Sequence, residues 1–336
     1  MSGFNQRWRQ FRAISLPENC PPIISIGNLT TGGTGKTPVI IALAQYYESL
    51  GMRCLILTRG YGGKPRPDGA VLSSEQGDEP WLIQSQLKHS IVLANPDRVL
   101  LLNLGLASKP DIILLDDGYQ YQQLPRQLNV LLVDGKRGLG NEYLLPAGPL
   151  REPLSALKRA DVVLLTKQIN ADVKQRVEKH LYAQHHFIPV LECPFEQLSM
   201  LTLLENHQTQ HWQDITPETT IGIVTGIAQP EDFIQTLEGN LKQSIAKAFI
   251  YPDHANFSDV DSTVLLDWLQ DDPQRILITT EKDAVKLAHF ETLVNSKRVW
   301  VQPIAPIFPW HMLTESKELQ QLKHYNQPLN DHDKHP

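Results

Sequence analysis

The sequence predicts an α/β protein, with a doubly wound, mostly parallel sheet in the first half of the chain and a second, smaller α/β unit after it. Two observations lead to this prediction. Short, entirely apolar runs recur between helical patterns, as is typical of parallel strands buried on both faces. The first run, 23–26, also ends in a glycine-rich turn that opens onto an apolar-periodic segment from Val39 to Leu50.

The remaining elements follow in order. Further strands of the first unit are predicted at 54–58, 91–94, 112–115, 130–133 and 162–165. Strands of the second unit are predicted at 221–224, 246–250, 275–278 and 299–301, with a helix at 230–237. Ser258 and Asp261 form a predicted capping box for a helix that ends at Leu269.

The glycine-rich turn is typical of a phosphate-binding loop. Its candidate ATP-binding residues are Thr31, Gly32, Gly33, Thr34, Gly35, Lys36 and Thr37. Glycines let backbone N–H groups surround a polyphosphate, while Lys36 reaches the β- and γ-phosphates and the Thr37 hydroxyl ligates Mg²⁺. Thr30 stands where the usual first glycine belongs, as in the variant loops of partitioning-type ATPases. We therefore expect a P-loop NTPase-type sheet; the alternative is a glycine-rich turn that merely precedes Lys-Thr.

Asp116 and Asp117 end the apolar strand 112–115 and form a second candidate site. An Asp at this place, the Walker B position, holds Mg²⁺ directly or through water. Neighbouring side chains of a strand point opposite ways, so only one of the two faces the metal unless the chain has already turned. The alternative is an ordinary Asp-Asp-Gly turn.

Other candidates lie at strand and helix ends. Arg59 and Tyr61 follow a strand, where ligands of open parallel sheets gather. From the residues alone, Asp78 is better explained as a helix cap, and His254 as a hydrogen-bonded bystander. Thr166-Lys167 resembles the start of a guanine-reading motif, but Ile169 replaces its carboxylate, which favours ATP.

Composition limits the classes of function. The chain has 336 residues, a net charge of -6 and three widely spaced cysteines, so we expect a reduced protein with no nucleic-acid partner. No apolar run approaches the roughly 18 residues of a membrane-spanning helix. Residues 1–20 nevertheless place Phe4, Trp8 and Phe11 at helical spacing among arginines. This pattern suits a helix at a membrane surface, or equally a terminal helix packed on its own domain.

Nine stretches, in order from Ile23 to about Leu287, resemble the tetraacyldisaccharide 4'-kinases, the lipid A pathway kinases of Gram-negative bacteria. They are I-G-N-L-T-T-G-G-T-G-K-T-P, T-R-G-Y-G-G, G-D-E-P, P-D-R-V, L-L-D-D-G-Y-Q-Y, L-L-P-A-G-P-L-R-E-P, G-I-A-x-P, D-H-x-x-F-S and T-T-E-K-D-A-V-K-L. The phosphate loop is shared with many NTPases. The combination of the third, fifth and sixth stretches is specific.

The resemblance implies an ATP- and Mg²⁺-dependent kinase that phosphorylates the 4'-hydroxyl of a lipid A disaccharide 1-phosphate. It also implies that Asp78 and His254 form the catalytic pair, with the histidine accepting the hydroxyl proton. Arg98 and Arg151 become candidates for phosphate contacts, because guanidinium matches phosphate oxygens. Gln120 joins the candidate substrate-binding residues.

We expect such an enzyme to work at the cytoplasmic face of the inner membrane as a peripheral protein, without an obligate protein partner. Fewer residues precede the first strand than in most family members, so the start is truncated or the membrane attachment weak. Where the family often has two histidines after the aspartate, this chain has His254-Ala255. The alternatives are a partitioning or metallochaperone-like ATPase switch and a non-catalytic nucleotide-binding paralogue.

The domain organisation follows from these elements. Residues 1–190 form a predicted P-loop kinase domain, and 214–300 a smaller α/β domain. Between them, 191–213 is a predicted β-ribbon linker, because polar and apolar residues alternate there. Residues 301–336 are expected to be a C-terminal return and a loose tail.

Overall fold

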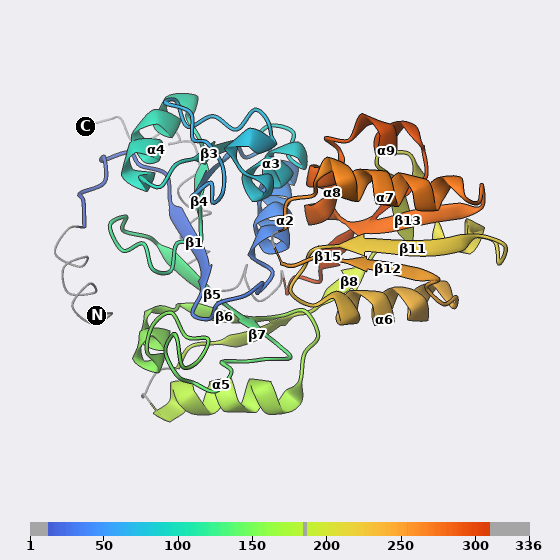
Figure 1. The fold of residues 1–336 in the computed structure, drawn as a ribbon. Coiled ribbons are helices and arrows are strands. Elements are labelled where there is room, and N and C mark those ends of the chain that lie inside the picture. The colour runs from blue at the N-terminus through green and yellow to red at the C-terminus, as the bar shows by residue number, and fades with distance from the viewer. Residues whose placement is uncertain (1–12, 184–186, 254, 310–336) are drawn as a thin grey trace, which may run out of the picture.

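Two β-sheets make up the protein, and a two-stranded ribbon lies between them (Figure 1). The structure is a computed structural model and describes residues 13–183, 187–253 and 255–309. Helices cover both faces of each sheet (Figure 1). The predicted α/β class is confirmed.

The first sheet contains seven strands in the order β3-β2-β4-β1-β5-β6-β7, and every neighbouring pair is parallel. The strands are β1 (Ile23–Asn28), β2 (Cys54–Thr58), β3 (Ile91–Ala94), β4 (Ile112–Asp116), β5 (Leu128–Asp134), β6 (Val162–Thr166) and β7 (Val190–Cys193). The six predicted runs lie in β1 to β6. Their apolar sequences follow from burial on both faces of a parallel sheet.

Side chains along each strand of this sheet alternate between two faces, and each face has its own hydrophobic core. Ile24 and Ile26 pack on the face covered by α2 (Lys36–Ser49) and α3 (Asp78–Ser85). The opposite face is covered by α4 (Arg98–Gly105) and α5 (Ala171–Ala183). Three short 3₁₀ turns lie at Ser74–Gln76, Leu106–Ser108 and Leu154–Arg159. The sheet is therefore doubly wound, as predicted.

The second sheet contains six strands in the order β10-β9-β14-β13-β11-β12. They are β9 (Met200–Leu203), β10 (Thr209–His211), β11 (Thr220–Thr225), β12 (Lys247–Ile250), β13 (Arg275–Thr280) and β14 (Val299–Gln302). The pairs β10-β9 and β9-β14 are antiparallel, and the others are parallel. A parallel core with an antiparallel edge is common in α/β sheets.

Helices of the second unit lie on both faces of its sheet (Figure 1). They are α6 (Pro230–Leu241), α7 (Asp259–Gln270), α8 (Glu281–Leu287) and α9 (Glu291–Asn295), with a 3₁₀ turn at Trp212–Asp214. The predicted capping box is present: Ser258 accepts from the Asp261 N–H, and Asp261 accepts from the Ser258 N–H. These bonds satisfy N–H groups that a helix start leaves without partners.

The range predicted as a linker contributes to all three sheets. Its first strand is β7 in the seven-stranded sheet, and β9 and β10 join the six-stranded sheet. Between them, β8 (Phe195–Gln197) pairs with β15 (Ile304–Pro306) as the connecting ribbon. Phe308, just after β15, packs into the core of the first sheet. The division of the chain into four domains stays a prediction.

Candidate active site

The carboxyl ends of strands from both sheets border one cleft of about 1990 Å³. All of Thr31–Thr37 line it, together with Asp116 and Asp117 from the end of β4. The second unit contributes side chains such as Gln229 and Thr280. Ligands of open α/β sheets bind beyond the carboxyl ends of strands, so this cleft is the candidate active site.

The phosphate loop has the backbone that anion binding requires. Gly32 and Gly35 have φ values of 96° and 80°, a left-handed conformation that costs glycine little. No side chain caps the start of α2, which leaves its N–H groups available to an anion. Thr34 Oγ1 is buried and has no hydrogen-bond partner within the described ranges. This loop fits the phosphates of ATP.

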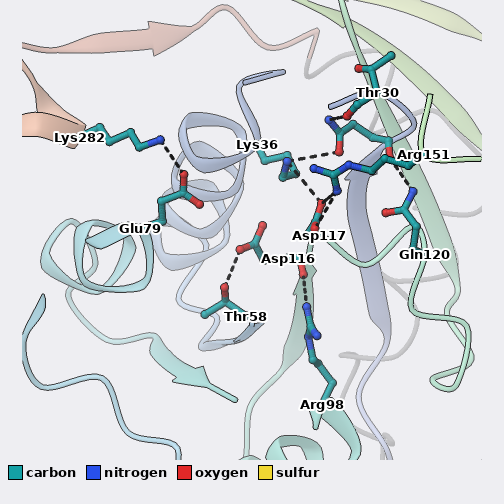
Figure 2. A network of polar contacts seen from close by, with 11 residues as sticks. Thr30, Lys36, Thr58, Glu79, Arg98, Asp116, Asp117, Gln120, Arg151 and Lys282 are labelled. Carbon is teal, nitrogen blue, oxygen red and sulfur yellow. Dashed lines mark hydrogen bonds and ion pairs between the residues drawn. The ribbon is translucent and has the colours of Figure 1, made fainter. Parts of the chain in front are cut away.

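Lys36 lies inside a network of polar side chains, shown in Figure 2. Its Nζ is 3.4 Å from Asn28 Oδ1 and 3.4 Å from Asp117 Oδ1. Asn28 Nδ2 also donates to the Thr30 carbonyl at 2.7 Å. The end of β1 therefore orients the lysine and ties it to the start of the phosphate loop.

Asp117 is held by two cations. Arg151 Nη1 lies 3.1 Å from both of its carboxylate oxygens, and Lys36 approaches one of them. Burial by itself would raise the pKa of Asp117. The positive charges of Lys36 and Arg151 outweigh this effect and keep that pKa below its ordinary value. The φ of Asp117 is 49°, so the chain turns directly after β4. This turn is the condition under which both neighbouring carboxylates reach the same cleft.

Asp116 is buried and accepts a 2.7 Å hydrogen bond from Thr58 Oγ1, at the end of β2. Burial raises the pKa of Asp116 to about 6, and the charge of Asp117 adds to this rise while Lys36 opposes it. The two adjacent carboxylates thus differ sharply in how readily they ionise. A cation between them would relieve their repulsion.

The residues present fit a magnesium ion bound together with a nucleotide. Mg²⁺ is commonly held by one or two carboxylates plus substrate phosphates, and Thr37, Asp116 and Asp117 all line the cleft beside the phosphate loop. No group of three or more His, Cys, Asp or Glu side chains able to hold a metal occurs in the described part of the chain. The hydroxyl of Thr37 and the two carboxylates thus suit a metal shared with the phosphates of ATP.

The other predicted substrate-binding residues all line the cleft, but their contacts differ. Arg59 and Tyr61 are exposed at its wall. Arg98 is buried, lies over the Tyr121 ring, and donates weakly to the Asp116 carbonyl at 3.5 Å. Gln120 donates to the Asn28 carbonyl at 2.8 Å, which links it to the residue that orients the lysine.

Asp78 is the first residue of α3, and Gly77 is the N-cap. Asp78 therefore stands one residue past the cap position predicted by the alternative, and together with Glu79 it is an acidic residue of the first helical turn. It lies 3.7 Å from Lys286 Nζ in α8, across the boundary between the two units. His254 is outside the described residues, so its predicted pairing with Asp78 stays a prediction.

Sequence reasoning missed several contributors to the site. Thr58 and Asn28 orient Asp116 and Lys36, and Glu79 contacts Lys282 at 3.2 Å (Figure 2). Thr58 and Glu79 stand next to Arg59 and Asp78, and Asn28 lies in the stretch I-G-N-L just before the phosphate loop. The neighbouring motifs were a signal, but the partners became visible only through spatial contacts.

Fold and site together define a P-loop nucleotide-binding phosphotransferase with a second α/β unit beside the nucleotide site. A sequence profile of the family described as tetraacyldisaccharide-1-P 4'-kinase (LpxK) matches residues 4–321. The chain belongs to this family.

Individual relatives carry the same family name. The chain is 36% identical over 301 residues to a tetraacyldisaccharide 4'-kinase of Syntrophus aciditrophicus (strain SB), covering 84% of this chain and 79% of that one. It is 37% identical over 275 residues to one of Pseudomonas fluorescens (strain Pf-5), covering 80% and 74%. It is also similar to the crystal structure of LpxK from Aquifex aeolicus in complex with ATP, with a TM-score of 0.71, 27% identity, and coverage of 95% and 94%.

A membrane-spanning helix was not expected. Within 13–183, 187–253 and 255–309, no helix has both the length and the apolar character needed to cross a membrane.

The raised pKa of Asp116 predicts a pH-dependent stability without Mg²⁺. A carboxyl whose pKa is higher in the folded chain contributes most below its unfolded value of about 4, and this contribution is lost as pH rises through about 6. Asp116→Asn has no proton to lose there. Urea unfolding in EDTA should show the variant gaining stability relative to wild type as the pH rises from about 4 to about 6. A difference that stays constant with pH would contradict the burial argument.

Proposed function

We propose that this protein transfers the γ-phosphoryl group of ATP to the 4'-hydroxyl of a tetraacyldisaccharide 1-phosphate in lipid A biosynthesis, giving lipid IVA. The observation that carries the proposal is the shared ion pair of Lys36, Asp117 and Arg151 at the phosphate loop, in a cleft that the second unit borders. Membership of a family named for this reaction supports the choice of acceptor.

The chain's own groups account for the binding of ATP. Backbone N–H groups of Gly32–Lys36, at the start of α2, face the phosphates. The Lys36 ammonium group stays close to the negative charge of the γ-phosphoryl group while that group is transferred. Arg151 is anchored on Asp117 and offers its remaining N–H groups to phosphate oxygens. Mg²⁺, held by Thr37 with Asp116 or Asp117, would neutralise charge on the phosphates.

The acceptor hydroxyl loses its proton as its oxygen bonds to the γ-phosphorus and the bond to ADP breaks. In this proposal His254 accepts that proton, and Asp78 orients the imidazole. Two contacts of Lys286, a residue of the second unit, support the arrangement. Its ammonium group lies within ion-pair distance of Asp78, and it donates a hydrogen bond to the carbonyl of Ala255, which follows His254 in the sequence. Arg59, Tyr61, Arg98 and Gln120 are proposed to bind the disaccharide.

We further propose that the protein works as a peripheral enzyme on the cytoplasmic face of the inner membrane. Residues 1–12 carry the aromatic and basic pattern, and Ile14, just after them, donates its N–H to the Gln123 carbonyl at 3.0 Å. Gln123 lines the cleft. A membrane-facing N-terminus would therefore enter the fold beside the mouth through which a lipid headgroup must pass.

The family membership does not favour the alternative of a switch-type ATPase, which shares the T-G-G-T-G-K-T loop. Such a protein would hydrolyse ATP without the disaccharide. A non-catalytic nucleotide-binding paralogue would neither hydrolyse ATP nor phosphorylate the disaccharide.

The function is tested by incubating the protein with γ-labelled ATP and the acylated disaccharide 1-phosphate. A doubly phosphorylated lipid should form, and EDTA should prevent its formation. Lys36→Ala should lower turnover by about 10²-fold or more while the protein stays folded, because the phosphates lose their flexible point charge. Near-normal turnover of Lys36→Ala would remove the phosphate-loop interpretation.

The proposed pair predicts losses that do not add. Asp78→Ala, His254→Ala and the double variant should share similarly low kcat values, with the KM for ATP little changed, because two residues that act as a unit fail together. The kcat/KM profile should also lose its acidic limb when His254 is replaced, since a base must be deprotonated to work. Multiplied losses in the double variant would show that the two side chains act independently.

Membrane attachment is tested by flotation with vesicles that contain anionic lipid. Replacing Phe4, Trp8 and Phe11 together by Ser should lower vesicle binding by about tenfold or more, because the buried apolar area at the interface is lost. Tyr182→Ser is the matched control, since Tyr182 is an exposed aromatic on α5. Equal flotation of the triple variant and wild type would refute the role of this segment.

A further inference from the structure

Lys286 is a buried lysine at the boundary between the two units. It lies in α8 and is only 6% exposed. Its Nζ donates a 2.7 Å hydrogen bond to the Ala255 carbonyl and lies 3.7 Å from Asp78 Oδ2 in α3. A buried ammonium group is costly unless it is paired, so these two contacts explain why the position tolerates a lysine.

The helix that carries Lys286 is itself firmly anchored. Asp283, one turn earlier, is fully buried and accepts from Thr225 Oγ1 at 2.8 Å and from the Gly226 N–H at 3.0 Å. These bonds tie α8 to the end of β11. Lys282, on the same side of α8, contacts Glu79 beside Asp78. Lys286 therefore projects from a rigid platform toward the start of α3.

The two contacts of Lys286 differ in kind. The bond to Ala255 has ordinary hydrogen-bond length, so it fixes the backbone of the loop after β12. The distance to Asp78 is within ion-pair range but beyond a hydrogen bond. The ammonium thus attracts the carboxylate while leaving its oxygens able to accept a hydrogen bond from an imidazole N–H.

We infer that Lys286 is a positioning residue for phosphoryl transfer: it holds Asp78 of the first unit and the backbone beside His254 of the second unit on one ammonium group. This inference rests on the roles proposed above for Asp78 and His254. Lys286 touches neither ATP nor the reacting hydroxyl in this account. It acts through Asp78 and the Ala255 loop.

The experiment compares Lys286→Met with wild type in the labelled-ATP transfer assay. The kcat should fall by about 10²-fold, because a small misplacement of reacting groups has an effect of this size. The KM for ATP should change by less than about twofold, since the nucleotide contacts lie elsewhere. Lys286→Gln, which keeps a donor for the Ala255 carbonyl but loses the charge, serves if Lys286→Met fails to fold.

Lys136→Met is the matched control. Lys136 contacts Asp232 at 2.6 Å and joins the same two units on another side of the cleft, with both side chains well exposed. Its loss should change kcat by less than about twofold, as expected for an exposed ion pair. A large loss in this control would indicate that any pair between the units matters, and would overturn the specific role of Lys286.

A double-variant cycle separates positioning from simple stability. If Lys286 acts through Asp78, then Lys286→Met should cause little further loss of kcat in an Asp78→Ala background. Multiplied losses, or a Lys286→Met rate close to that of wild type, would overturn the inference while leaving the proposed function intact. Failure of the wild-type protein to phosphorylate the lipid would instead overturn the proposed function, and this inference with it.

Discussion

The arrangement of the site depends on one carboxylate, Asp117, placed between Lys36 and Arg151. β4 ends one residue earlier, and the left-handed backbone at Asp117 turns its side chain toward the phosphate loop. Three chain segments far apart in the sequence therefore meet at a single charge. These partly exposed ion pairs link the phosphate loop, the end of β4 and the loop before Pro153.

The second sheet supplies the other wall of this cleft. Polar contacts join the two units at separate places: α3 meets α8 through Asp78 and Glu79, and Lys167 after β6 donates to Gln229 before α6 at 3.1 Å. Between these contacts, the carboxyl ends of strands from both sheets border the cleft. A phosphate held by one unit and a hydroxyl brought by the other would thus meet in a space with charged groups on both sides.

Much of the fold could be predicted because buried parallel strands have a simple sequence pattern, as at 112–115 and 162–165. The order of strands could not, since it depends on packing rather than on local pattern. The same holds for the site. The glycines before Lys36 predict its role in binding phosphate. The hydrogen bond between Thr58 and Asp116, in contrast, joins residues 58 positions apart, which no local pattern reveals. Asp78 shows the limit most clearly: its local sequence favours a helix cap, whereas the structure places its side chain 3.7 Å from Lys286 Nζ of α8, in the second unit.

The central claim is that the cleft couples ATP cleavage to an acceptor hydroxyl, and it is tested most directly by measuring ADP release with and without the acylated disaccharide 1-phosphate. The account predicts that ADP forms in a one-to-one ratio with doubly phosphorylated lipid, and that release falls to a small background without the disaccharide. ADP release at the same rate in both conditions would contradict it and would instead indicate a switch-type ATPase.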